Sequence, residues 1–63
     1  MNIEKETLSV RDLSERLGIS LPKAYELVKQ PGFPVLKIGS RILIPIEGLR
    51  KWLMEQMERG SQS

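Results

Sequence analysis

The residues best suited to chemistry are basic and hydroxyl-bearing side chains in the middle of the chain. Residues 18–45 contain four basic side chains against Glu26 alone, a net charge of +3, although the whole 63-residue chain carries only +2. The flanking segments are nearly neutral, with three basic and four acidic residues over 1–17 and three of each over 46–63. A positive charge concentrated in one segment suits a localised anionic partner.

The residue types on which most catalytic and metal sites depend are missing. The sequence has no Cys and no His, which excludes thiol catalysis, histidine acid–base chemistry and zinc sites built from those ligands. A nucleophilic role for Tyr25, as in tyrosine recombinases, fails because there is no His and too little chain for an Arg-rich pocket. A chain of 63 residues is also near the lower limit for folding on one core. We therefore predict that the protein is not an enzyme and needs no metal, cofactor or small-molecule ligand.

Two short helices are predicted to position the basic residues. Ser9 followed by Asp12 has the form of a capping box, which indicates a helix start, and Gly18 stands where a left-handed residue ends a helix. Ser20 can cap a second helix, which Gln30-Pro31-Gly32 ends. Two short helices joined by a tight glycine-containing turn are typical of a helix-turn-helix. The predicted inner face of the pair consists of Leu13, Leu17, Ile19, Ala24 and Leu27.

A β-hairpin and a third helix are predicted to follow. Phe33–Ile38 and Arg41–Ile44 have the pattern of two strands, and Gly39-Ser40 suits a type II′ turn between them. The third helix runs from about Ile46 to Met57, with Trp52 in the core. The expected fold is mainly α with a small β-hairpin: a winged helix-turn-helix of three helices and a two-stranded wing. The domain is predicted over residues 8–58, with flexible ends at 1–7 and 59–63.

In a helix-turn-helix, the second helix presents its outward residues to base edges in the major groove. The residues predicted to contact DNA from this helix are Ser20, Leu21, Pro22, Lys23, Tyr25, Glu26 and Lys29. Lys23 suits a guanine edge or a phosphate, whereas Leu21 and Pro22 suit a thymine methyl group. The hydroxyls of Tyr25 and Ser20 suit phosphates.

The helix residues also have plainer structural explanations. Lys23 and Lys29 are compatible with an exposed face that only adds solubility. Glu26 suits a cytosine amino group, but it equally suits a surface position that holds a neighbouring lysine. Tyr25 is compatible with a half-buried core position.

The hairpin tip supplies a second predicted contact. Lys37, Ser40 and Arg41 surround the tight turn, and so narrow a basic tip can lie along the backbone or enter the minor groove. The alternative is that Lys37 and Arg41 protect an exposed sheet edge from pairing with other chains.

Three segments together resemble a known family. "LSVRDLSERLGIS", "KAYELVKQPGFPVLKIGSRILIP" and "EGLRKWL" are similar to excisionase-type helix-turn-helix proteins, which are related in fold to the winged-helix domains of MerR-type regulators. The resemblance covers about Leu8 to Leu53, and its most specific residues are Ala24-Tyr25, Phe33-Pro34, Gly39, and Leu49 with Trp52. It implies DNA binding without catalysis, with a recognition helix over Ser20–Gln30 and a wing over Lys37–Arg41. The sequence departs from the family pattern at Ser40, which stands before Arg41 where many relatives have two or more basic residues after the turn glycine. It departs again at Leu21-Pro22, where polar or basic residues are common.

The resemblance also implies a biological role. We expect sequence-specific binding of double-stranded DNA in the bacterial cytoplasm, at the nucleoid, with no membrane association. The predicted role is that of an excisionase-like factor of a mobile element, which bends or directs DNA with an integrase and through self-association on DNA. One alternative is a small transcriptional regulator of phage or genomic-island genes. Another, from a different class, is a protein-interaction adaptor that has lost DNA binding.

Overall fold

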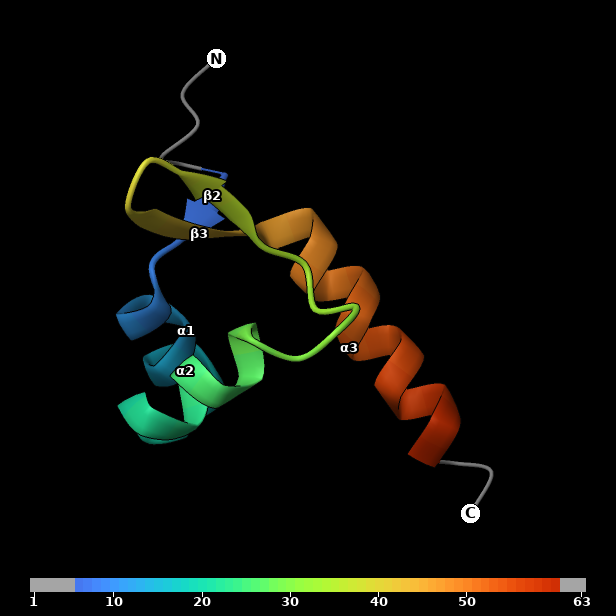
Figure 1. Cartoon of the computed structure of the whole chain (residues 1–63). Coiled ribbons are helices and arrows are strands. Elements are labelled where there is room, and N and C mark those ends of the chain that lie inside the picture. Colours follow the sequence, from blue (N-terminus) through green and yellow to red (C-terminus); the bar gives the residue numbers. More distant parts are fainter. Residues whose placement is uncertain (1–5, 61–63) are drawn as a thin grey trace.

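Three helices and a three-stranded antiparallel sheet make up the fold (Figure 1). The computed structural model describes residues 6–60, so the segments predicted as flexible at 1–5 and 61–63 lie outside it. The elements, in chain order, are β1 (Thr7–Leu8), α1 (Val10–Leu17), α2 (Leu21–Val28), β2 (Leu36–Ile38), β3 (Arg41–Pro45) and α3 (Ile46–Gly60). The sheet lies above α1 and α2, and α3 extends away from them (Figure 1). The predicted winged helix-turn-helix class is confirmed.

Local side-chain chemistry sets the ends of α1 and α2. The Asp12 backbone N–H donates to the Ser9 hydroxyl at 3.0 Å, and the Ser9 N–H donates to the Asp12 carboxylate at 3.4 Å, which completes the predicted capping box. Gly18 ends α1 with φ +69°, a conformation that only glycine adopts at little cost. The Lys23 N–H then donates to the Ser20 hydroxyl at 3.3 Å and caps α2. Because only Gly18, Ile19 and Ser20 separate the two helices, the link leaves them little freedom to change their relative orientation.

The hairpin turns as its sequence predicts. Ile38 pairs with Arg41 across the turn, and Gly39 has φ +62°. No other residue type in the described chain has a positive φ, so Ser40 cannot be in the second position of a type I′ turn. The turn is therefore compatible with type II′.

A third strand was not predicted. Thr7 was predicted to belong to a flexible N-terminal segment, but it is part of β1 and pairs with Pro45 of β3. The strand order is β1-β3-β2, so β3 is the central strand. The Ile46 N–H also donates to the Glu6 carbonyl at 2.9 Å. The sheet thus extends into the segment predicted as flexible, because β3 offers Thr7 and Leu8 backbone partners.

β2 is shorter than the predicted strand Phe33–Ile38. It begins only at Leu36, because Pro34 has no N–H for a ladder and the Phe33 N–H donates instead to the Gln30 carbonyl at 3.2 Å. Phe33 is buried in the core rather than placed in the sheet. This loop holds α3 close: a Cβ on Gly48 would lie 2.9 Å from Cβ of Pro34.

The core lies where the helix pair, the sheet and the start of α3 meet. Its buried apolar members are Leu8, Val10, Leu13, Ala24, Val28, Phe33, Ile44 and Leu49. Trp52, predicted as a core residue, is half-buried and packs against this cluster, with its ring edge-on to Phe33 at a centroid distance of 4.9 Å. Helix α3 continues to Gly60, so Arg59 and Gly60, predicted as tail, belong to the helix.

Candidate nucleic-acid interface

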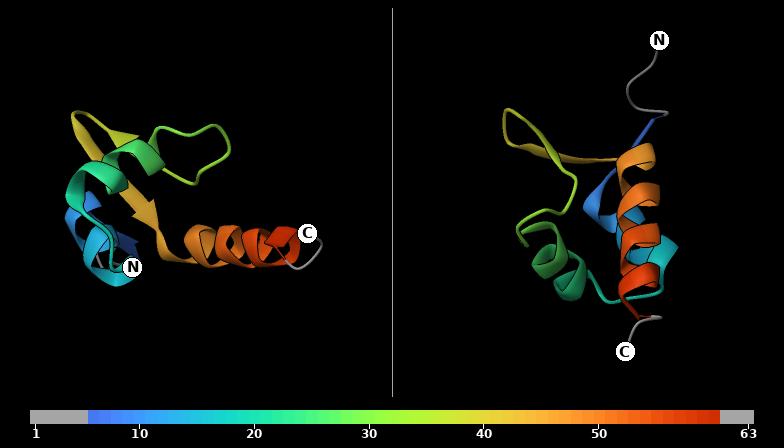
Figure 2. Two further views of the ribbon diagram at one scale, coloured as in Figure 1. Left: turned by 90° about the horizontal axis from the view of Figure 1, so that it is seen from below. Right: turned by 90° about the vertical axis from the view of Figure 1, so that its right-hand side faces the viewer.

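Helix α2 and the hairpin project from the same side of the molecule. In the right-hand view of Figure 2 the hairpin turn and α2 both extend toward one side, and α3 runs down the other. Two elements that project together can contact neighbouring stretches of one extended partner. The predicted recognition helix and the predicted wing therefore share one face.

A groove of about 410 Å³ lies between these two elements and the start of α1. We call it the hairpin groove; its lining residues are Ser9, Val10, Arg11, Tyr25, Ser40, Arg41, Ile42 and Leu43. It brings together three of the predicted contact residues, Tyr25 from α2 and Ser40 and Arg41 from the hairpin. Tyr25 is 44% exposed and is neither in the core cluster nor among the apolar residues packed against it.

A second groove, of about 490 Å³, lies along a different face of α2. We call it the α3 groove; its lining residues are Leu17, Ile19, Lys23, Glu26, Leu27, Gln30 and Trp52. Lys23 precedes Tyr25 by two positions, which is about 200° around a helix of 3.6 residues per turn. The structure therefore divides the predicted contact residues of α2 between two grooves.

The charges in the α3 groove are balanced. The Lys23 ammonium lies 3.7 Å from a Glu26 carboxylate oxygen, one helical turn away, and both side chains are at least 70% exposed. An ion pair this exposed contributes little to stability, but it offsets the positive charge that Lys23 presents. Glu26 thus forms an ion pair with a neighbouring lysine, which is one of the two roles suggested for it from the sequence.

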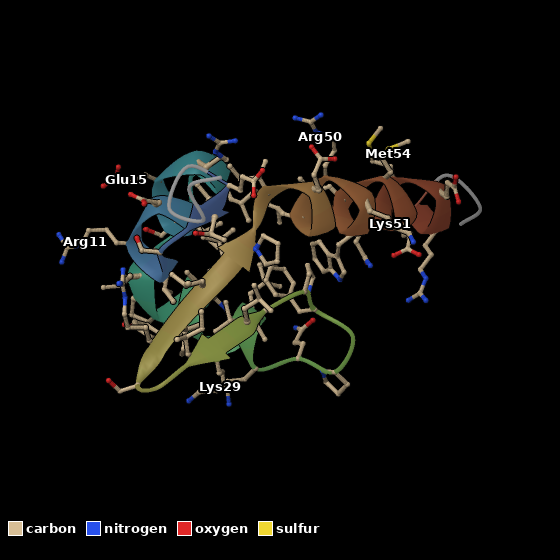
Figure 3. The ribbon with its side chains drawn as sticks, turned by 90° about the horizontal axis from the view of Figure 1, so that it is seen from above. Arg11, Glu15, Lys29, Arg50, Lys51 and Met54 are labelled. Carbon is tan, nitrogen blue, oxygen red and sulfur yellow. The ribbon has the colours of Figure 1, made fainter. Side chains whose placement is uncertain are left out.

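The remaining predicted contact residues differ in how accessible they are. Leu21 is half-buried and packs against the core, so the expectation that it faces away from the core is wrong. The Ser20 hydroxyl accepts the Lys23 N–H and is engaged as a cap. The others, Pro22, Lys29 and Lys37, are exposed, and Lys29 points outward at the end of α2 (Figure 3).

Arg11 is the residue of this region that sequence analysis missed. It lines the hairpin groove from the first turn of α1 and extends outward on the side where the hairpin turns (Figure 3). A signal was present in the sequence. The N-terminal turn of a helix favours acidic residues because the backbone N–H groups there are partly positive, so an arginine in that turn gains nothing from the helix itself. Its place on α1 suggests a partner outside the helix.

The comparisons with known proteins agree with this architecture. The family model of the helix-turn-helix domain matches residues 7–57. The chain belongs to this helix-turn-helix family. Its members are excisionase-like small DNA-binding domains, so the resemblance drawn from the three sequence segments is confirmed. Neither the curated proteins nor the solved structures give a match to the chain.

The family match includes every element of the interface. It begins at Thr7 in β1, passes through both helices of the helix-turn-helix and the hairpin, and ends within α3. Both grooves of this helix-turn-helix domain are lined entirely by residues inside that match. Over residues 6–60, no helix has the length and apolar character needed to cross a membrane.

Proposed function

We propose that this helix-turn-helix protein recognises a specific DNA sequence by laying α2 in the major groove while the hairpin contacts the adjacent groove. The observation that supports the proposal most directly is the shared face of α2 and the basic hairpin tip, with Tyr25, Ser40 and Arg41 around one groove. Recognition helices of this motif insert their N-terminal half, and arginines are favoured in narrow minor grooves. The proposed action is binding without catalysis.

The residues divide by the kind of contact they suit. Arg41 and Lys37 on the hairpin and Lys29 at the end of α2 are exposed and suit phosphate oxygens or a minor groove. Lys23 and Pro22, in the first turn of α2, are exposed and suit base edges. Few side chains of α2 are thus available to read sequence, so much of the affinity would come from the DNA backbone.

Such an interface would be weak in a single copy. With about 4 to 6 phosphate contacts, the slope of log K against log salt would be about −4 to −5. We propose that several copies bind adjacent sites, or that a recombinase partner such as an integrase supplies further contacts. The end of α3 is available for them: Met54 is 59% exposed and Met57 73% exposed. Arg50 and Met54 lie on the edge of the molecule opposite Lys29 (Figure 3).

The role we propose is that of an excisionase-like factor, which bends or directs DNA for the recombination of a mobile element, in the cytoplasm of a bacterium. Support comes from the family and from the placement of α2 and the hairpin on one face. A helix and a hairpin that bind neighbouring grooves can favour a bent duplex. A transcriptional regulator would use the same face. The two roles differ in where the sites lie and in whether the bound DNA is bent.

The test is a binding assay on duplexes from the protein's own locus, at about 50 and 200 mM salt, against a scrambled duplex of equal length. We expect a specific shift that weakens by roughly a hundred- to a thousandfold between these salt concentrations. A circular-permutation gel then measures bending. Specific binding to straight DNA at a promoter would favour the regulator, and tight binding by one protein per site would contradict the need for neighbours.

One observation favours a second candidate function, that of a protein-interaction adaptor. Leu36 and Ile38 on β2 are 46% and 52% exposed, although both are apolar residues of the hairpin. An adaptor would show no shift on locus DNA at either salt concentration. That result would overturn the DNA-binding proposal.

A further inference from the structure

We propose that α1 takes part directly in DNA binding, because the hairpin groove is a site for one phosphate group of the DNA backbone, held between Arg11 and Arg41. This inference rests on the proposed function and adds Arg11 of α1 to the residues proposed to contact DNA. In it the first helix is more than a brace for α2. The DNA strand would touch three elements, α1, α2 and the hairpin.

The charge of the groove is the first argument. Its lining includes two arginines and no acidic residue. Neither Arg11 nor Arg41 forms an ion pair with any other residue of the described chain, 6–60. Two positively charged residues that line one groove favour an anion there, because an opposite charge nearby stabilises each of them. The groove is therefore arranged for an anion that the protein does not itself supply.

The other grooves give the contrast. In three other grooves of the described chain, a basic residue is accompanied by an acidic one. Lys23 accompanies Glu26 in the α3 groove, Arg16 lies with Asp12 and Glu15 beside α1, and Arg59 lies with Glu55 near the end of α3. The uncompensated charge in the hairpin groove is thus a local feature and does not follow from the small net charge of the chain.

The chemistry of the lining suits a phosphodiester. Guanidinium groups donate paired hydrogen bonds to phosphate oxygens, and the hydroxyls of Tyr25 and Ser40, both exposed residues, can donate further ones. The Ser9 hydroxyl is engaged, because it accepts the Asp12 N–H at 3.0 Å. Val10, Ile42 and Leu43 provide apolar surface in the same groove. That surface fits a deoxyribose, which a free phosphate ion lacks.

The position of the groove agrees with the proposed docking. If α2 occupies a major groove and the hairpin the adjacent minor groove, the strand that separates the two grooves of DNA must pass between them. The hairpin groove lies between α2 and the hairpin, on the side to which both project (Figure 2). Arg11 reaches this strand from α1, and Arg41 reaches it from β3.

The test compares Arg11→Ala with Arg16→Ala, which removes an arginine from the same helix but from the groove that contains Asp12 and Glu15. Fluorescence anisotropy is measured on the specific and the scrambled duplex over a salt series. We expect Arg11→Ala to weaken binding about fivefold on both duplexes and to reduce the salt slope by about 0.9, the value of one phosphate. Arg16→Ala should bind like the unchanged protein. Circular dichroism checks the fold, and Arg11→Gln repeats the test if the alanine variant unfolds.

A scan with methylphosphonate linkages identifies the phosphate itself. Each linkage neutralises one backbone phosphate, and one position should weaken the unchanged protein about fivefold but Arg11→Ala by less, because only Arg41 then remains to contact that phosphate. An Arg11→Ala protein with unaltered affinity and slope would overturn the phosphate site. If Arg41→Ala still weakens binding, the proposed function survives that result. No binding by the unchanged protein at any salt concentration would overturn both.

Discussion

The hairpin groove and the α3 groove lie on two faces of the same eight-residue helix, yet they differ in almost every property. The first is lined by two arginines and no acidic residue, and its one aromatic side chain, Tyr25, is 44% exposed. The second pairs Lys23 with Glu26, and its aromatic residue, Trp52, is half-buried against the core. One side of α2 therefore borders uncompensated positive charge, and the other side borders a charge-balanced groove that Trp52 of α3 also lines.

This difference shows how a very small domain separates stability from binding. A helix of eight residues has few faces, and a side chain that closes the core cannot also read DNA. The structure places Leu27 and Trp52 on the closing side, and leaves Tyr25 and the hairpin arginine for contact. Substitutions on the two sides should therefore affect different measurements.

The largest expected effect is on stability, from Trp52→Ala. The indole is half-buried and lies edge-on to Phe33, so its loss should reduce the free energy of unfolding by about 2–3 kcal/mol. Urea denaturation measures this. Met54→Ala, two residues along the same helix at a side chain 59% exposed, is the control and should change stability by less than about 0.5 kcal/mol. Equal stability of both variants would mean that the α3 groove does not close the domain.

Next in size is the effect of Arg41→Ala on DNA affinity. Removing a charge from the groove without acidic residues should weaken binding by about tenfold, while Lys23→Ala, on the charge-balanced side, should lose only about two- to threefold. Both variants should melt like the unchanged protein. Anisotropy titrations at one salt concentration give the comparison. A larger loss for Lys23→Ala would reverse the assignment of the two faces.

Gly39→Ala tests the hairpin without touching the α3 groove. Gly39 has φ +62° and nothing within 4 Å of an added Cβ, so the cost is backbone strain alone, about 1 kcal/mol. Thermal unfolding should detect it, and DNA affinity should fall because the tip with Arg41 is displaced. Gly60→Ala, at an ordinary helical position with open space, is the matched control. Unaltered affinity in Gly39→Ala would argue that the turn geometry is not needed for binding.

The smallest effect is expected from Glu26→Gln. It releases Lys23 from its pair and removes one negative charge near the DNA, so affinity should rise about twofold with little change in stability. If Glu26 instead accepts a hydrogen bond from a cytosine, specific binding falls and binding to the scrambled duplex does not. Titrations on both duplexes distinguish these two outcomes.

The parts of the fold that the sequence predicted depend on local chemistry. The capping box at Ser9 and Asp12, the left-handed Gly18, the cap at Ser20 and the turn at Gly39 each act within a few residues, and all four occur in the structure. Such features can be predicted from short sequence patterns, because the backbone groups involved are only a few residues apart along the chain.

The parts that were missed depend on distant neighbours. Strand β1 has only two residues, too few to show a period, and its partner Pro45 stands far along the chain from Thr7. Leu21 lies on the outward side of a helical wheel, but the core that half-buries it is built from other elements. Arg11 lines the same groove as Arg41 of the hairpin. The two residues are far apart in the chain, so no sequence pattern predicts that they lie close together.

Strand β1 has a consequence for handling the protein. It covers one edge of β3 while β2 covers the other, so each side of the central strand is occupied. A truncated protein that begins at Ser9 would retain the recognition helix and the hairpin, but it would expose unpaired N–H and C=O groups of β3. Such an open edge is a template for strand addition. Forms that lack β1 should therefore aggregate at concentrations where the 63-residue chain remains monodisperse. A fusion partner is better attached after α3 than immediately before Thr7.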